Sequence, residues 1–249
     1  MILTDLEPII AAHSIEELWA PLPLRMAEYG FDRVIYGFTR FRRGHSFGDP
    51  RDLLILSNHG PAYLDPFIKG GLYFNAPMVR WSAENVGSCS WRWIQQRAAA
   101  GLLTEAEKKV LQFNRQHGVT AGYSISFMEL SSRAKGAVGL SSKTLSQDQV
   151  DEIWARHGRQ IEILWNVAHL KLVNLPHNPS GRALTPRQRE ALEWVSEGKT
   201  TADIATIMGL TPATVEKHLR LAREALDVET TVQAVLKAAV QNQIFRVEE

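Results

Sequence analysis

Residues 184–239 read LTPRQREALEWVSEGKTTADIATIMGLTPATVEKHLRLAREALDVETTVQAVLKAA, and this stretch decides the fold of the last quarter of the chain. A first helix is expected to begin after Thr185 and to end at Gly198, because threonine caps helix starts and glycine favours helix ends. Thr201 begins a second, shorter helix, whose apolar residues repeat at helical spacing until Gly209 turns the chain. Two short helices joined at a glycine turn are typical of a helix-turn-helix.

The third helix of this stretch is amphipathic. It begins after Thr211, and its apolar residues follow one another at spacings of four, three and four positions: Val215, Leu219, Ala222 and Leu226. The opposite face carries Glu216, Lys217, Arg220, Arg223 and Glu224. With a fourth helix behind it, the segment is predicted to be a compact all-α, four-helix unit whose third helix leaves a charged face outward.

That outward face has the chemistry that reads DNA. A helix in the major groove must present donors and acceptors to base edges from its first turns. Arg220 can donate two hydrogen bonds to guanine, Glu216 can accept a hydrogen bond from cytosine, and Lys217 can reach a base or a phosphate. Threonine hydroxyls at the helix starts lie where phosphates are usually held. The candidate DNA-binding residues are Lys199, Thr200, Thr211, Thr214, Glu216, Lys217, Arg220 and Arg223. The alternative is a helical protein-binding module whose charged face is only solvated.

The charge of this segment indicates that one copy binds DNA only moderately. From Arg182 to Glu249 there are nine Lys and Arg and ten Asp and Glu, so the formal balance is 9 − 10 = −1. Neutralisation of phosphates by basic residues supplies most non-specific affinity for DNA. The positive field must therefore be local. A dimer on a roughly palindromic site is expected to supply the affinity that one copy lacks.

The segment resembles the DNA-binding domain of the LuxR and GerE family of bacterial transcription regulators. The residues that match without a gap are Leu184, Thr185, Arg187, Glu190, Leu192, Trp194, Gly198, Lys199, Thr200, Ile204, Ala205, Leu210, Thr214, Val215 and His218. One position departs from the family pattern, because Gln188 stands where a glutamate usually follows the arginine. This change weakens any buried ion pair there but keeps the capacity to form hydrogen bonds. The resemblance implies a DNA-binding transcription regulator.

The whole chain has the composition of an ordinary cytoplasmic protein of two domains. It has 249 residues, of which 45% are hydrophobic and 22% charged. Its single cysteine, Cys89, fits a reducing compartment. No secretory leader and no run of about eighteen apolar residues is present, so no membrane association is expected. We predict a sensory or dimerisation domain over 1–173, a linker rich in proline and polar residues over 174–183, and the DNA-binding domain over 184–249.

The first domain mixes helices and strands. Helices are expected over 1–12, 14–29, 60–71, 104–117 and 147–172, and strands over 33–41, 52–57, 123–130 and 136–142. This order predicts an α+β fold, an α-β-α sandwich with an antiparallel sheet. The last helix carries apolar residues on more than one face, with Ile153, Ile163, Val167 and Leu170 outside the main stripe. The surplus predicts a homodimer, and the alternative is a wide stripe that only covers the sheet.

This domain also resembles the autoinducer-binding domain of the same family, which binds acyl-homoserine lactones between its sheet and its helices. Pro77, Trp91, Gly118 and Gly122 match the family pattern. Other positions in the implied pocket differ. Tyr63 replaces a tryptophan, Phe67 and His59 replace tyrosines, and Ala76 replaces an aspartate, while Ser142 matches a Ser or Thr position. The candidate ligand-binding residues are Tyr36, His59, Tyr63, Phe67, Ala76, Trp91 and Ser142.

The alanine at position 76 has the largest consequence for the ligand, because the aspartate of the family accepts the amide proton of the lactone. A buried N–H group without an acceptor costs about 1–3 kcal/mol, or about ten- to a hundredfold in affinity. The sequence therefore predicts a small signal other than an ordinary acyl-homoserine lactone, flatter or less polar. The alternative is a closed core in a regulator that dimerises without a ligand.

Enzymatic activity is not expected. The chain contains no Gly-rich phosphate loop, Cys-x-x-Cys, His-Glu-x-x-His or Gly-x-Ser-x-Gly motif, and its histidines show no metal-ligand spacing. The first 60 residues also lack the acidic residues of a phosphorylated receiver domain. No cofactor or metal is predicted. The predicted partners are double-stranded DNA, a second copy of the chain, RNA polymerase and a small amphipathic ligand.

Overall fold

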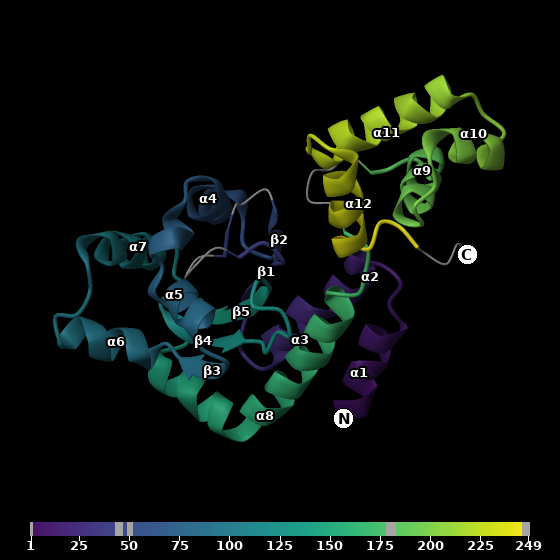
Figure 1. Cartoon of the computed structure of the whole chain (residues 1–249). Coiled ribbons are helices and arrows are strands. Elements are labelled where there is room, and N and C mark those ends of the chain that lie inside the picture. Colours follow the sequence, from purple (N-terminus) through teal and green to yellow (C-terminus); the bar gives the residue numbers. More distant parts are fainter. Residues whose placement is uncertain (1, 43–46, 49–51, 178–182, 246–249) are drawn as a thin grey trace. The chain divides into compact units, whose positions relative to one another are not determined.

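The structure is a computed structural model, and it describes residues 2–42, 47–48, 52–177 and 183–245. The chain divides into two compact units, Met1–Val173 and Asn174–Glu249 (Figure 1). Each unit has a hydrophobic core of its own.

The first unit is an α+β sandwich, as the sequence predicts. Its helices are α1 (Ile2–Ala11), α2 (Ile15–Trp19), α3 (Pro21–Glu28), α4 (Pro61–Leu64), α5 (Pro77–Glu84), α6 (Arg92–Ala99), α7 (Glu105–Gln116) and α8 (Gln147–Leu172). A π-helical turn (Asp65–Lys69) and a 3-10 turn (Leu72–Asn75) follow α4. The strands are β1 (Arg33–Thr39), β2 (Leu54–Ser57), β3 (Gly87–Ser90), β4 (Ala121–Ser126) and β5 (Lys135–Ser142).

The five strands form one antiparallel sheet in the order β2-β1-β5-β4-β3. Helices α1 and α2 pack on α8, which contacts β4 and β5, whereas α5 contacts β4 from the other side of the sheet (Figure 1). The core on the α8 side is built from large residues, including the fully buried Tyr36 and Trp165. The core on the other side contains Tyr63, Phe67 and Tyr73. Each face of the sheet therefore has its own packed layer.

Side chains alternate along β1 between these two layers. Tyr36 and Phe38 are buried on the α8 side, where the Tyr36 ring stacks on Trp165 with the centroids 6.3 Å apart. Ile35 packs against the core on the other side. In register, Ile35 lies opposite Gly139 of β5. Because directly paired residues of an antiparallel sheet share one face, this pairing fixes which residues of β5 and β4 point away from α8.

Several predicted elements differ in extent from the observed ones. The helix expected over 14–29 is two helices, since α2 ends before Pro21, which has no N–H to continue the hydrogen-bond ladder. The sequence analysis did not identify α5, β3 or α6. Strand β3 reads Gly-Ser-Cys-Ser and has none of the branched or aromatic residues that signal a strand. The bounds of α8, in contrast, match the prediction, because Ser146 and Gln149 form a capping box at its start.

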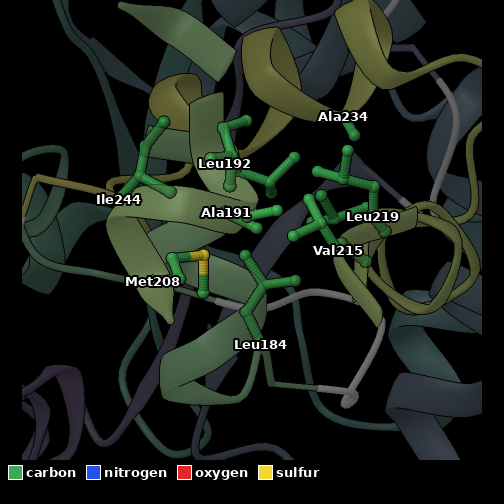
Figure 2. Close-up of a cluster of buried hydrophobic side chains, with 13 residues drawn as sticks. Leu184, Ala191, Leu192, Met208, Val215, Leu219, Ala234 and Ile244 are labelled. Atoms are coloured by element: carbon green, nitrogen blue, oxygen red, sulfur yellow. The ribbon is translucent and has the colours of Figure 1, made fainter. Parts of the chain in front are cut away.

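The second unit is the predicted four-helix domain, with α9 (Pro186–Ser196), α10 (Thr201–Met208), α11 (Pro212–Leu226) and α12 (Thr231–Val240). A threonine caps the start of every one of these helices: Thr185, Thr200, Thr211 and Thr230. Between α10 and α11, Gly209 has a φ of 66°, a left-handed conformation that glycine adopts without strain. The helices enclose a core of residues such as Leu192, Val215 and Leu219 (Figure 2).

The first residues of the predicted linker belong to this second unit. Leu175 is buried, and the backbone N–H of His177 donates to the carbonyl oxygen of Gln241 at 3.2 Å. The side-chain amide of Gln243 donates to the carbonyl oxygen of His177 at 3.2 Å. Residues 174–177 are thus attached to the end of α12, whereas residues 178–182 of the predicted linker lie outside the described residues.

Candidate functional site

The helix-turn-helix of the second unit places α11 with its apolar stripe inward. Val215, Leu219, Ala222 and Leu226 are all buried in the core of the unit, as the sequence predicts. Arg220 lies on the other side, and its side chain is 54% exposed. The polar face of α11 is therefore on the surface of this unit.

Threonine hydroxyls at the starts of α10 and α11 serve as helix caps. The hydroxyl oxygen of Thr200 accepts from the backbone N–H of Asp203, and its O–H donates to the Asp203 carboxylate at 2.6 Å. The hydroxyl of Thr200 and its backbone N–H, which donates to the same carboxylate at 3.0 Å, lower the pKa of Asp203. The Thr211 hydroxyl accepts from the backbone N–H of Thr214, and the two hydroxyls lie 2.9 Å apart. The predicted phosphate-binding threonines thus fix the helix starts in the free protein.

The charged residues of α11 differ in how freely they can reach DNA. Glu216 accepts a hydrogen bond from the Thr201 hydroxyl of α10 at 2.9 Å, and Arg220 forms an ion pair with Glu224 one turn further along. Arg223 is partly buried and donates to the Thr231 hydroxyl of α12 at 2.9 Å. The sequence pattern grouped Arg223 with the outward residues, but this contact ties its guanidinium to the fold.

Gln188, which departs from the family pattern, forms part of the cap of α9. Its side-chain oxygen accepts from the Thr185 backbone N–H at 3.0 Å, while its own backbone N–H donates to the Thr185 hydroxyl at 3.3 Å. A glutamine at the third helical position completes this capping box as a glutamate does. The substitution therefore leaves the start of the helix-turn-helix intact.

A second candidate site is a cavity of about 290 Å³ in the first unit, on the side of the sheet away from α8. Its floor is formed by β1, β4 and β5, and its walls come from α5, α6, α7 and the segment from His59 to Tyr73. Five of the seven predicted ligand-binding residues line it: His59, Tyr63, Phe67, Ala76 and Trp91. A cavity of this size lies at the lower end of the range typical of small-molecule sites.

The structure corrects two predicted ligand-binding residues, Tyr36 and Ser142. Tyr36 points to the α8 side, where its hydroxyl lies 2.9 Å from Nδ1 of His169. Ser142 is buried, and its hydroxyl accepts from the backbone N–H of Leu145 at 3.2 Å. In both cases a neighbour one position away lines the cavity, Ile35 in β1 and Ser141 in β5. A shift of one residue along a strand moves a side chain to the opposite face.

The cavity exists because the strand residues that face it are small. The lining includes Gly37 of β1, Ala137 and Gly139 of β5, and Ser124 of β4. Valine or leucine at these inward positions would fill the space that the helices leave above the sheet. The sequence analysis missed these four residues, although small residues at alternate positions of a predicted strand were a usable signal.

The polar groups of the cavity are largely neutral. Burial and the neighbouring Arg33 lower the pKa of His59 to about 4, so its imidazole is uncharged at neutral pH. Burial raises the pKa of Tyr63 well above its usual value, which keeps the phenol protonated. Among the lining residues that the structure describes, none carries a carboxylate. The cavity therefore favours an uncharged, mainly apolar ligand.

An aromatic stack forms one wall. The Tyr63 ring stacks on His59, Phe67 and Phe113, with centroid distances of 4.4, 5.2 and 5.3 Å. The Tyr63 hydroxyl donates to the side-chain oxygen of Asn114 at 3.2 Å. These contacts on several sides hold Tyr63 in place as a rigid part of the wall.

Comparison with known families matches both units. The autoinducer binding domain matches residues 14–172, and the domain described as "bacterial regulatory proteins, luxR family" matches residues 182–238. The chain belongs to the LuxR family of bacterial transcription regulators. Members of this family are DNA-binding regulators and not enzymes.

Relatives of known sequence or structure are similar to this chain over 69% to 98% of its length. The transcriptional activator protein AnoR of Acinetobacter nosocomialis is 25% identical over 241 residues, which cover 94% of this chain and 95% of AnoR. The crystal structure of the N-acylhomoserine lactone dependent LuxR family factor CepR2 from Burkholderia cenocepacia matches with a TM-score of 0.54 and 18% identity, over 69% of this chain and 93% of CepR2. The Escherichia coli protein SdiA matches with a TM-score of 0.50 and 17% identity, over 98% of both chains. The two solved structures support the fold.

The described residues form neither a membrane span nor a metal site. No helix in the described part of the chain is long and apolar enough to cross a membrane. Among the same residues, no group of three or more His, Cys, Asp or Glu side chains is arranged to hold a metal ion. The functional reading of this LuxR-family protein therefore rests on the helix-turn-helix and the cavity.

Proposed function

We propose that this LuxR-family regulator binds a small-molecule signal in the cavity of its first unit, and that the signal is not an ordinary acyl-homoserine lactone. The single observation that carries the proposal is a cavity of about 290 Å³ with no carboxylate among its described lining residues. A ligand amide would find no charged acceptor there, whereas charge-assisted hydrogen bonds are the stronger ones.

The local structure at Ala76 supports this selectivity. Ala76 is buried in front of Pro77 at the start of α5, the position where the resemblance places the aspartate that receives the lactone amide. Its own backbone N–H is already donated to the carbonyl oxygen of Tyr73 at 3.1 Å. A related fold accommodates a ligand without an amide, since SdiA has been crystallised in complex with octanoyl-rac-glycerol.

We further propose that the protein acts in the cytoplasm as a homodimer on a roughly palindromic DNA site. Ile163 and Leu170 of α8 are 37% and 61% exposed, and Ile10 of α1 is 61% exposed near the same end of the domain, where the Lys171 side chain donates to the Ile10 carbonyl. Exposed apolar residues on the first unit and a formal charge of −1 on the DNA-binding segment both fit association with a second copy of the chain. Contact with RNA polymerase would then change transcription.

A second reading is a ligand-independent dimer with a closed core. The observation in its favour is that Tyr63, Tyr73 and Trp91 already donate to Asn114, Gly48 and Ser124, so the aromatic wall needs no ligand. In that case the cavity is a packing defect between helices and sheet.

Native mass spectrometry on protein purified from its own host tests the proposal. The expected result is a two-chain mass with a retained small molecule that is released on denaturation. A two-chain mass without a ligand would favour the second reading. A single-chain mass at micromolar concentration, with and without DNA, would contradict the dimer.

A further inference from the structure

The hydrogen-bond inventory of the cavity shows where a ligand's polar group can be held. The aromatic donors of the wall are occupied, because the Tyr63 and Tyr73 hydroxyls donate to Asn114 and Gly48, each at 3.2 Å. The indole N–H of Trp91 donates to the Ser124 hydroxyl at 3.0 Å. A ligand that enters the cavity must therefore find its donors elsewhere.

Unused donors lie on the floor. Ser124 of β4 and Ser141 of β5 line the cavity and are only 4% and 2% exposed. Ser124 accepts from Trp91, and its own O–H makes no hydrogen bond to another described residue. The Ser141 hydroxyl likewise has no partner within the described parts of the chain. Ser124 is thus paired as an acceptor, whereas the Ser141 hydroxyl can still donate to a group inside the cavity.

The two serines lie side by side in the sheet. Ser124 is paired with Gly139 and Ser141 with Gly122, so the serines are diagonal neighbours on one face of β4 and β5. Trp91 covers the glycines, because a Cβ atom on Gly122 would lie 3.1 Å from Cε3 of its ring. A Cβ atom on Gly139 would lie 3.8 Å from Cζ2 of the same ring, so the ring lies between the two serines and a carbonyl group beside it can reach the hydroxyl of Ser141.

The remaining acceptors are neutral. His59 is uncharged, and the Asn114 oxygen already accepts from Tyr63. In a trans amide the N–H points away from the C=O, so a serine that holds the carbonyl cannot also accept this N–H, which must share the Asn114 oxygen with Tyr63 or remain unpaired, whereas an ester needs only the serine donor. The positive Arg115 side chain lies among the lining residues but is exposed, so an acid would have to leave its carboxylate at the rim.

We infer that the cavity takes a neutral amphiphile with a carbonyl group and no amide N–H, an acyl ester being the simplest class, and that Ser141 donates to this carbonyl. This inference rests on the proposed function of the cavity and adds the chemical class and the residues that select it. The acyl chain then lies along the aromatic wall and the small residues of β1 and β5.

Three probes with one acyl chain test the inference on the full-length protein by isothermal titration. They are 1-octanoylglycerol as the ester, N-octanoyl-homoserine lactone as the amide and octanoate as the acid. The ester is expected to bind about ten- to a hundredfold more tightly than the amide, because only the amide buries an unpaired N–H. Ala76→Asp should reduce or reverse this preference, since it supplies an anionic acceptor.

The serine variants localise the carbonyl. Ser141→Ala is expected to weaken ester binding about two- to tenfold, the effect of one neutral hydrogen bond. It removes no hydrogen bond within the described protein, so its fold should be unchanged. Ser88→Ala is the matched control, because Ser88 is a half-exposed serine of β3 outside the cavity lining. Ser124→Ala also removes the acceptor of Trp91 and therefore needs a parallel measurement of stability.

The inference is overturned if the amide or octanoate binds wild-type protein as tightly as the ester, or if Ser141→Ala leaves ester binding unchanged. Absence of binding by all three probes also overturns it. If the host protein nevertheless retains a small molecule, the proposed function stands and only the ligand class assigned here is wrong.

Discussion

Among single residues, Arg220 has the most specific expected contact with DNA. In the free protein its guanidinium is paired with Glu224, and both side chains are about half exposed at 54% and 52%. Exposed pairs of this kind contribute little to stability. The pair can therefore open when a guanine offers two acceptors to the guanidinium, and stability does not oppose the exchange.

Arg220→Ala is expected to abolish sequence-selective binding, whereas Lys217→Ala should weaken binding to all sequences alike. A bidentate arginine discriminates by about 1–3 kcal/mol, while one phosphate contact lowers the salt dependence by about one unit. Fluorescence anisotropy with a selected operator and a scrambled duplex at several salt concentrations measures both effects. An unchanged operator preference in Arg220→Ala would refute the assignment of Arg220.

A second single residue, Gly136 of β5, leaves no room for a side chain. A Cβ atom built there would lie 2.5 Å from Cε1 of His169, a ring that is buried between Tyr36 and Glu129. Gly136→Ala must push this ring away, at a cost of about 1–3 kcal/mol in the free energy of unfolding. Urea denaturation measures the cost.

Gly37→Ala is the control for that experiment. A Cβ at Gly37 meets only the flexible end of Ile55, at 3.4 Å. Its unfolding midpoint should stay near that of the wild type or rise slightly, because alanine restricts the unfolded chain. Equal midpoints for the two variants would show that the contact with His169 is not tight.

At the scale of elements, the predictable parts are those whose ends carry a chemical signal. The four helices of the DNA-binding domain and α8 were predicted closely, because threonine or serine caps mark their starts. Strand β3 and helices α5 and α6 were missed. Helix α6 has no buried residue and no side-chain cap, so its sequence carries neither an apolar stripe nor a start signal.

The strands show a different limit. Alternation along 33–39 predicts β1, but both of its faces are largely apolar, so the sequence does not tell which face meets α8 and which meets the cavity. Tyr36, one of the candidate ligand-binding residues, lies on the α8 face. The candidates taken from the family pattern in the helical segment, such as Tyr63 and Phe67, do line the cavity, because a helix alignment without gaps preserves the direction of side chains.

At the scale of the whole molecule, the proposed dimer makes a direct prediction. Leu170→Lys is expected to raise the dimer dissociation constant by about tenfold or more, because burying an unpaired ammonium costs several kcal/mol. Sedimentation velocity across a concentration series measures this change.

Leu130→Lys provides the comparison, since Leu130 is fully exposed in the loop between β4 and β5. It adds the same charge and should leave the association unchanged. If both variants associate like the wild type, the apolar face of α8 is not the interface.

Residues 174–177 are attached to the DNA-binding unit at the end of α12, which limits the length of chain that connects the two units. Because His177 is bonded to Gln241 and Gln243, the chain enters this unit beside the place where its last helix finishes. The covalent connection between the two units is then confined to the residues around Val173, so a change in chain length at that point would leave the hydrogen bonds of His177 to the end of α12 intact.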